Sequence, residues 1–139
     1  IKDTVNHVLQ KHQVICDSIS IINYEYPLRK GFYFKKAINT LTLFGAESVI
    51  SVMHQNSNFY WHQGHGLKPF KTNHDLRLER DFIYRETGGI HVLSHAAFQV
   101  DKKLEQNRMS HIIMDPRSAT SVDSLEDINY LEYLYGTVR

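Results

Sequence analysis

The chain of 139 residues has little of what marks several protein classes. A single cysteine, Cys16, rules out an internal disulfide, so we expect a reducing, cytoplasmic setting with Cys16 as a small core residue. Three prolines and seven glycines leave no room for a low-complexity tract. No apolar run approaches the roughly 20 residues of a transmembrane helix. The sequence therefore excludes a disulfide scaffold and predicts no membrane partner.

The charge balance is nearly even, with a formal net charge of +1. Such a balance gives no reason to expect nucleic acid as a partner. An apolar content of 42% with 22% charged residues is ordinary for a globular protein and argues against disorder. Nine histidines are present, but no spacing among them matches a known zinc arrangement. The length predicts one compact domain.

The first half of the sequence predicts a strand, a helix and a second strand after a short opening helix. Apolar residues recur at helical spacing within 3–12 and again within 31–44, where Gly45 closes the second helix. The β-branched run within 14–22 is nearly continuous, which suits a strand buried on both faces of a parallel sheet. Residues 48–52 form the next strand. These elements predict a βαβ unit.

The second half begins with a change of character. Residues from about 54 to 87 are polar and aromatic, and we interpret them as a hairpin or flap inserted into a single α/β domain spanning 1–139. A glycine-led strand over 88–94 and a strand over 111–114 follow. A final helix over 124–135 should face inward through Ile128, Leu131 and Leu134.

Four motifs in this order resemble a known family. They are Asn23-Tyr-Glu-Tyr-Pro-Leu-Arg29, Ala46-Glu-Ser-Val-Ile-Ser-Val52, Arg77 with Tyr84-Arg-Glu-Thr-Gly-Gly-Ile90, and Ser121-Val-Asp-Ser-Leu-Glu-Asp127. Together they cover nearly the whole chain and resemble the acylneuraminate and Kdo cytidylyltransferases. The resemblance implies a partial Rossmann-like nucleotide-diphospho-sugar transferase fold, with a mostly parallel sheet and a hairpin insertion.

The same resemblance implies a reaction. Such enzymes join CTP to an acidic, sialic-acid-like sugar, give a CMP-sugar and pyrophosphate, and serve surface-glycan synthesis such as that of lipopolysaccharide. Magnesium would be held by Asp123 and Asp127, since Mg²⁺ prefers carboxylate oxygens. The family's first aspartate falls here on Ser121. From the residues alone, Asp123 could equally cap the last helix, and Asp127 could be a solvated partner of the helix dipole.

The resemblance also implies a set of substrate-binding residues. They are Asn23, Arg29, Arg77, Tyr84, Gly88 and Gly89. Arg29 could instead be an ordinary surface arginine, and the glycine pair could be a bulge before a core strand. Glu25 and Tyr26 stand where the family has small hydroxyl residues, and Glu25 brings negative charge toward an anionic substrate. Catalytic residues are not assigned.

The family's opening strand and phosphate-cradling loop have no counterpart before Asp3. The sequence therefore predicts a start roughly 80 to 90 residues late and a chain inactive on its own, an estimate checked against ordinary domain sizes. An exposed sheet edge and the aromatic Phe59-Tyr60-Trp61 favour a homodimer. Two alternatives stay open: a non-catalytic dimeric module that binds a sugar or a protein, and an unrelated α/β domain.

Overall fold

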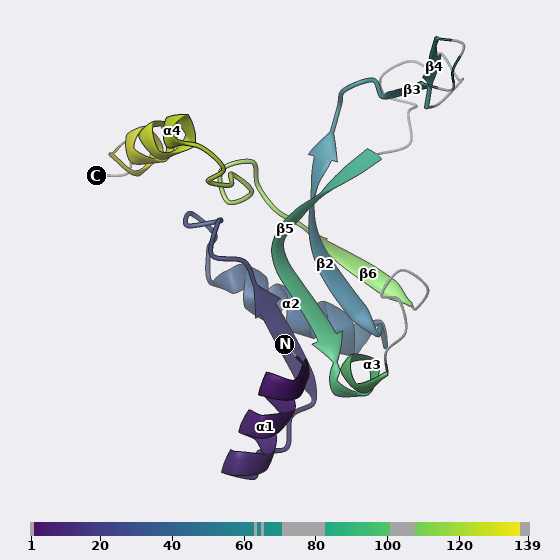
Figure 1. The fold of residues 1–139 in the computed structure, drawn as a ribbon, viewed down its shortest axis with the longest axis vertical. Coiled ribbons are helices and arrows are strands. Elements are labelled where there is room, and N and C mark those ends of the chain that lie inside the picture. Colours follow the sequence, from purple (N-terminus) through teal and green to yellow (C-terminus); the bar gives the residue numbers. More distant parts are fainter. Residues whose placement is uncertain (1, 63, 65, 71–82, 101–107, 137–139) are drawn as a thin grey trace. The chain divides into compact units, whose positions relative to one another are not determined.

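The computed structural model describes residues 2–62, 64, 66–70, 83–100 and 108–136. It separates into two compact units, one made of Ile1–Met53 with Glu86–Arg139 and the other of His54–Arg85. None of the helices in the described ranges is long and apolar enough to cross a membrane. In chain order (Figure 1) the elements are α1 (Lys2–His12), β1 (Ser18–Ile22), α2 (Phe32–Leu43), β2 (Ser48–Gln55), β3 (Tyr60–His62), β4 (Leu67–Pro69), β5 (Ile83–Ser94), α3 (His95–Gln99), β6 (Met109–Ile113) and α4 (Leu125–Gly136).

The main sheet has the strand order β1-β5-β2-β6. β1 pairs antiparallel with β5, and β2 pairs parallel with β6. The arrows of β2 and β5 point in opposite directions (Figure 1), so β5 alone runs against the other three strands. The predicted α/β fold is confirmed, but the sheet is mixed rather than mostly parallel. The reversed β5 lies between β1 and β2, so the only parallel neighbours in this sheet are β2 and β6.

The first strand is shorter and less buried than its apolar run predicts. β1 begins at Ser18, whereas Val14 and Ile15 lie before it with 53% and 94% of their surfaces exposed. Cys16 also precedes the strand and is partly exposed, so its predicted place in the core is wrong. β1 is an outer strand of the sheet, and an outer strand cannot be covered like a central one.

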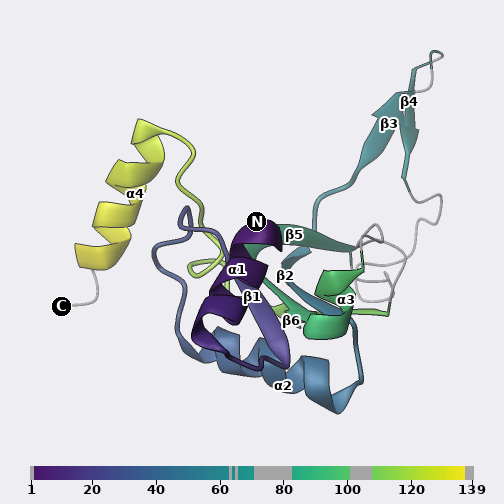
Figure 2. The same ribbon diagram turned by 60° about the horizontal axis from the view of Figure 1, so that its bottom comes forward.

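Helix α2 supplies one side of the hydrophobic core, and its predicted extent of 31–44 is confirmed. Tyr33, Ala37 and Leu41 recur every four residues and are buried on one face of the helix. Figure 2 shows α2 running along the sheet, where it packs against β6. The sheet residues in the same cluster are Val49, Ile90, Val92, Ile112 and Met114.

Helix α4 buries less than the sequence predicts. Leu131 is buried, but Ile128 is 41% exposed and Leu134 is only partly covered. The guanidinium of Arg117 donates a hydrogen bond to the carbonyl of Leu134, which ties the end of the helix to the loop that follows β6. The predicted inward stripe is therefore reduced to one fully buried residue.

Strand β5 is irregular at Gly88, whose φ of 71° lies in the left-handed region. A glycine of positive φ within a strand is a feature of a β-bulge. The Thr87 hydroxyl donates to the Ser51 carbonyl at 3.1 Å, and the Ser51 hydroxyl accepts from the Ile90 amide at 2.9 Å. The two hydroxyl oxygens lie 2.7 Å apart in the core. Buried hydroxyls therefore satisfy the backbone groups that the irregular strand leaves open.

Replacing Gly88 by alanine tests this strained position. A side chain in the left-handed region costs about 1 to 2 kcal/mol, so Gly88→Ala should lower the free energy of unfolding by about that amount. Gly31→Ala is the matched control, since Gly31 has a φ of −59° and an added Cβ would meet no atom within 4 Å. Urea unfolding measures both variants. Equal stabilities for the two would show that Gly88 is not conformationally required.

Candidate functional site

The strand directions bring three chain segments together at one edge of the main sheet. This edge is the one formed by the carboxyl ends of β1 and β6, not by an outer strand. β1 and β6 run the same way, so the loops after Ile22 and Ile113 leave the sheet at the same edge (Figure 1). β5 runs the opposite way and brings Gly88 and Gly89 to that edge. In α/β sheets, ligands bind beyond the carboxyl ends of the strands. This edge is therefore the candidate site.

The two loops are joined through Glu25. Its carbonyl accepts a hydrogen bond of 2.9 Å from the amide of Val122, the residue before Asp123. The side chain of Asn23 folds back on the same turn, because its amide nitrogen donates to the Glu25 carboxylate at 2.7 Å and its oxygen accepts from the Glu25 amide at 3.1 Å. Asn23 therefore shapes the loop after β1 and lies beside the loop that carries Asp123.

Arg29 links the same loop to the glycine pair. Its Nη1 donates to the carbonyls of Asn23 at 2.9 Å and of Gly89 at 2.6 Å, and its guanidinium lies 5.0 Å from the centre of the Phe34 ring. Burial lowers the pKa of Arg29. Its Nε is buried without a hydrogen-bond partner among the described residues. Arg29 is thus partly buried rather than an ordinary surface arginine, and it connects the loop after β1 to the glycine pair.

The glycine pair is approached closely by a side chain of the same protein. A Cβ placed on Gly89 would lie 3.4 Å from Cγ of Tyr26, and one placed on Gly88 would lie 3.5 Å from the Tyr26 hydroxyl. The Tyr26 ring therefore lies along both glycines. Asn23, Arg29, Gly88 and Gly89, four of the predicted substrate-binding residues, come together here, with Tyr26 over the pair.

An aspartate that the motifs did not single out organises the loop after β6. Asp115 accepts hydrogen bonds from the Tyr33 hydroxyl at 2.8 Å, from the amide and hydroxyl of Ser118 at 2.9 Å each, and from Lys30 at 3.2 Å. Burial alone would raise the pKa of Asp115, but these donors outweigh it and hold the pKa well below the usual range. The signal in the sequence was an Asp-Pro pair directly after the apolar run Ile112–Met114.

Asp123 and Asp127, the predicted metal ligands, both accept hydrogen bonds at the start of α4. The Asp123 carboxylate accepts from the Ser121 hydroxyl at 2.8 Å. Asp127 accepts from the hydroxyl and amide of Ser124, at 2.7 Å each, and from the Asp123 amide at 3.0 Å, while the Ser124 hydroxyl lies 3.3 Å from the Asp127 amide. These contacts, the Ser124 hydroxyl first, lower the pKa of Asp127. This reciprocal pair is a capping box at the start of α4.

The remaining predicted substrate-binding residues are Tyr84 and Arg77. Tyr84 lies in the unit His54–Arg85, where its ring centre is 5.0 Å from that of His54. Arg77 falls outside the described residues. Within the described part of the chain, no group of three or more His, Cys, Asp or Glu side chains could hold a metal ion.

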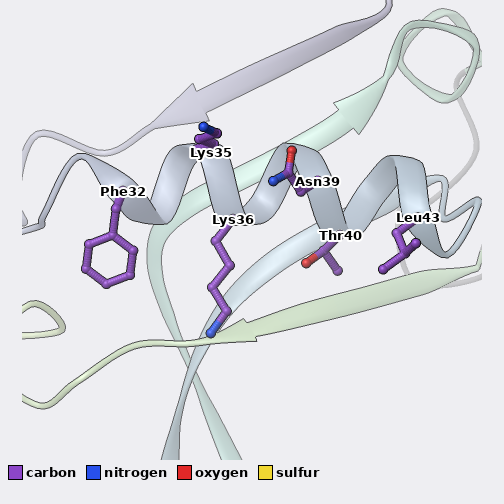
Figure 3. Close-up of a pocket in the computed structure, with 6 residues that line it drawn as sticks. All are labelled: Phe32, Lys35, Lys36, Asn39, Thr40 and Leu43. Carbon is purple, nitrogen blue, oxygen red and sulfur yellow. The ribbon is translucent and has the colours of Figure 1, made fainter.

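Two surface hollows lie near these elements. One, of about 380 Å³, is lined by α2 alone, through Phe32, Lys35, Lys36, Asn39, Thr40 and Leu43 (Figure 3). It contains none of the predicted site residues. The other, of about 640 Å³, lies between α4 and the two loops of the candidate site, and its walls include Pro27 and Val122. Only the second hollow adjoins the candidate site.

Comparisons with known proteins define the fold. No protein-family model matches the sequence, and no curated protein matches it. Among solved structures, the chain is similar to the crystal structure of 4-diphosphocytidyl-2C-methyl-D-erythritol synthase from Anaerococcus prevotii, with a TM-score of 0.61 and 12% identity. The match covers 92% of this chain and 64% of that one. The likeness is therefore one of fold: the chain shares the Rossmann-like α/β architecture of that synthase.

The depressed pKa of Asp115 predicts a pH dependence of stability. An unfolded aspartate has a pKa near 3.9, so the stabilisation is fully present above about pH 5 and is lost as the pH falls through and below 4. Asp115→Asn should lose about 1 to 3 kcal/mol at pH 7 and should show a flatter decline in acid. Tyr33→Phe removes one hydrogen-bond donor to Asp115. Its free energy of unfolding at pH 7 should therefore lie between those of the wild type and of Asp115→Asn. Urea unfolding at pH 3 to 7 measures this; equal acid slopes for wild type and Asp115→Asn would contradict it.

Proposed function

We propose that this chain is the sugar-binding part of a cytidylyltransferase that activates an acidic, sialic-acid-like sugar with CTP. The carrying observation is the convergence at one sheet edge of the loops after β1 and β6 with the glycine pair of β5. Two hydrogen bonds connect these segments. The Val122 amide donates to the Glu25 carbonyl at 2.9 Å, and Arg29 donates to the Gly89 carbonyl at 2.6 Å. The cytidylyltransferase-like fold and the four motifs in order support the same reading.

In the proposed reaction a sugar hydroxyl attacks the α-phosphorus of CTP. A phosphorus–oxygen bond forms, the hydroxyl proton is released and pyrophosphate leaves, giving a CMP-sugar. The described residues would act on the sugar side, because the edge holds Asn23, Arg29 and the glycine pair. The chain covers 64% of the length of its structural neighbour, so the complete activity is proposed for the native protein as its host makes it.

The donor set at this edge suits a shared magnesium ion better than one caged by protein alone. Asp127 is engaged in capping α4, which leaves Asp123 as the carboxylate best placed to reach a metal. Mg²⁺ commonly takes one or two carboxylates, several waters and substrate phosphates. Asp123 would hold such an ion with the nucleotide, and the ion would neutralise phosphate charge. The chain's own contribution is to fix Asp123 next to the Glu25 turn.

The test is release of pyrophosphate from CTP by the native protein, with an acidic sugar and Mg²⁺ present. Asp123→Asn should lower kcat/KM by about tenfold or more at limiting Mg²⁺, and Ser121→Asp should strengthen the response to Mg²⁺. Glu126→Gln, in the first turn of α4, is the matched control and should behave like wild type. A rate of pyrophosphate release that depends on neither the sugar nor Mg²⁺ would refute the proposal.

Two observations favour a second function, a non-catalytic module that binds a sugar or a protein. Tyr26 lies along Gly88 and Gly89, where a ligand would otherwise approach the backbone, and Ser121 replaces an acidic residue of the motif. In that case the native protein would bind an acidic sugar without releasing pyrophosphate. Calorimetric titration beside the turnover assay separates the two functions.

We further propose that the chain forms a homodimer through the β3–β4 hairpin. Its two three-residue strands and the residue after β4 carry exposed apolar side chains: Trp61 in β3 is 50% exposed, Phe70 after β4 is 59% exposed, and their ring centres lie 6.1 Å apart. A two-stranded hairpin is marginally stable by itself and gains from burial against a partner. Large aromatic side chains are the usual anchors of protein interfaces.

Replacing Trp61 by alanine tests the dimer. The variant should raise the dimer dissociation constant by about tenfold or more, as expected for an aromatic interface anchor. Tyr130→Ala is the matched control, since Tyr130 is an aromatic residue of similar exposure, 52%, on α4. Sedimentation velocity over a concentration series measures both. A Trp61→Ala protein that dimerises as tightly as wild type would exclude this interface.

A further inference from the structure

We propose that two copies of this chain associate through helix α4 of one copy and helix α2 of the other. The inference goes beyond the proposed function and rests on surfaces of one compact unit, Ile1–Met53 with Glu86–Arg139. Both helices belong to this unit, so every copy of the protein carries both surfaces. A second copy can therefore supply the partner helix.

The hollow of about 640 Å³ beside α4 provides the acidic half of the contact. Its walls are mainly apolar and include Leu28, Val122, Ile128, Leu131 and Tyr135. Among the described residues that line it, Glu132 alone carries a charge. The residues that α4 contributes recur at the spacing of one helix face. Ile128 is 41% and Tyr135 67% exposed, so the described part of the chain leaves this apolar stripe largely uncovered.

The exposed face of α2 provides the basic half of the contact. It carries the hollow of about 380 Å³, where Figure 3 shows Phe32 and Leu43 at the two ends and Lys36 between them. Phe32 is 55% and Leu43 78% exposed. Lys35 also lines this hollow. The face therefore combines apolar side chains that can be buried with two ammonium groups.

The two helices carry charges of opposite sign. Helix α4 contains Glu126, Asp127 and Glu132 and no lysine or arginine, whereas α2 contains Lys35 and Lys36 and no carboxylate. Complementary charges bring two surfaces together and fix their register, and apolar burial stabilises the contact. A helix face seated in an apolar groove is a recurring mode of recognition. The charges favour α2 of the second copy over a second α4, because two acidic helices would repel each other.

A two-fold arrangement forms this contact twice, with α4 of each copy on α2 of the other, and closes the assembly at a dimer. Stable interfaces bury about 1,200 to 2,000 Å² in total, which two such contacts reach more readily than one. Val122 directly precedes Asp123, and Leu28 directly precedes Arg29. The partner helix therefore lies against both loops of the candidate site.

The experiment reverses charges on each helix and then mixes the variants. Lys35→Glu with Lys36→Glu, or Glu132→Lys alone, should raise the dissociation constant of the dimer by about tenfold or more, because like charges then face each other. An equal mixture of the two variants should associate within about threefold of the starting protein, since both contacts of the mixed dimer again join opposite charges.

Sedimentation velocity of the native protein measures these constants, in a Trp61→Ala background that weakens the hairpin contact. Glu126→Lys is the matched control, because it makes the same charge change on the same helix at a residue outside the lining of the hollow. It should leave the dissociation constant within about threefold, as expected for a screened surface charge.

Restored association in the mixture supports the inference, because only a contact between copies can be restored by mixing. Unchanged dissociation constants in both reversed variants would overturn it, and so would folded variants that stay monomeric when mixed. Growth into open chains without a discrete dimer would overturn the two-fold arrangement. If a reversed variant does not fold, Lys35→Gln with Lys36→Gln and Glu132→Gln take its place, and each should weaken the dimer and reduce its dependence on salt.

Discussion

The reversed strand β5, set between β1 and β2, is the constraint on which the candidate site depends. β5 runs against its neighbours, and its register pairs Ile90 with Ile22, so the glycine pair lies just beyond the end of β1, where the loops after β1 and β6 leave the sheet. At the left-handed Gly88, hydroxyls of Ser51 and Thr87 bond to the local backbone from within the core.

Most of the polar side chains described at this edge form hydrogen bonds to other groups of the same chain. Arg29 donates hydrogen bonds from Nη1 to two backbone carbonyls. Asp115 accepts hydrogen bonds from Tyr33, Ser118 and Lys30, and Asp127 caps α4. Such contacts hold the loops in place before any ligand arrives, which is how a site is preorganised. Asp123 is the side chain through which the proposed magnesium ion would bind to these loops.

The sequence predicted the local elements well and their partners less well. Helix α2 was readable because Tyr33, Ala37 and Leu41 follow helical spacing, and such spacing is a local property. The position of β5 was not readable, since strand order depends on contacts between distant residues. Val14 and Ile15 have the composition of a buried strand but precede an outer one. At the site, motif order placed Asn23, Arg29, Gly88 and Gly89 together, while side-chain detail such as the Tyr26 contact and the Asp115 network needed coordinates.

The most direct test of the account is where the ligand binds. Amide NMR spectra of the ¹⁵N-labelled native protein, titrated with 3-deoxy-D-manno-octulosonate and then with CTP and Mg²⁺, report this residue by residue. The account predicts shifts at Gly88, Gly89 and Asp123, with none at the α2 residues Lys35 and Asn39 that line the separate hollow. Shifts confined to α2, with the glycine pair unchanged, would contradict the placement of the site at this sheet edge.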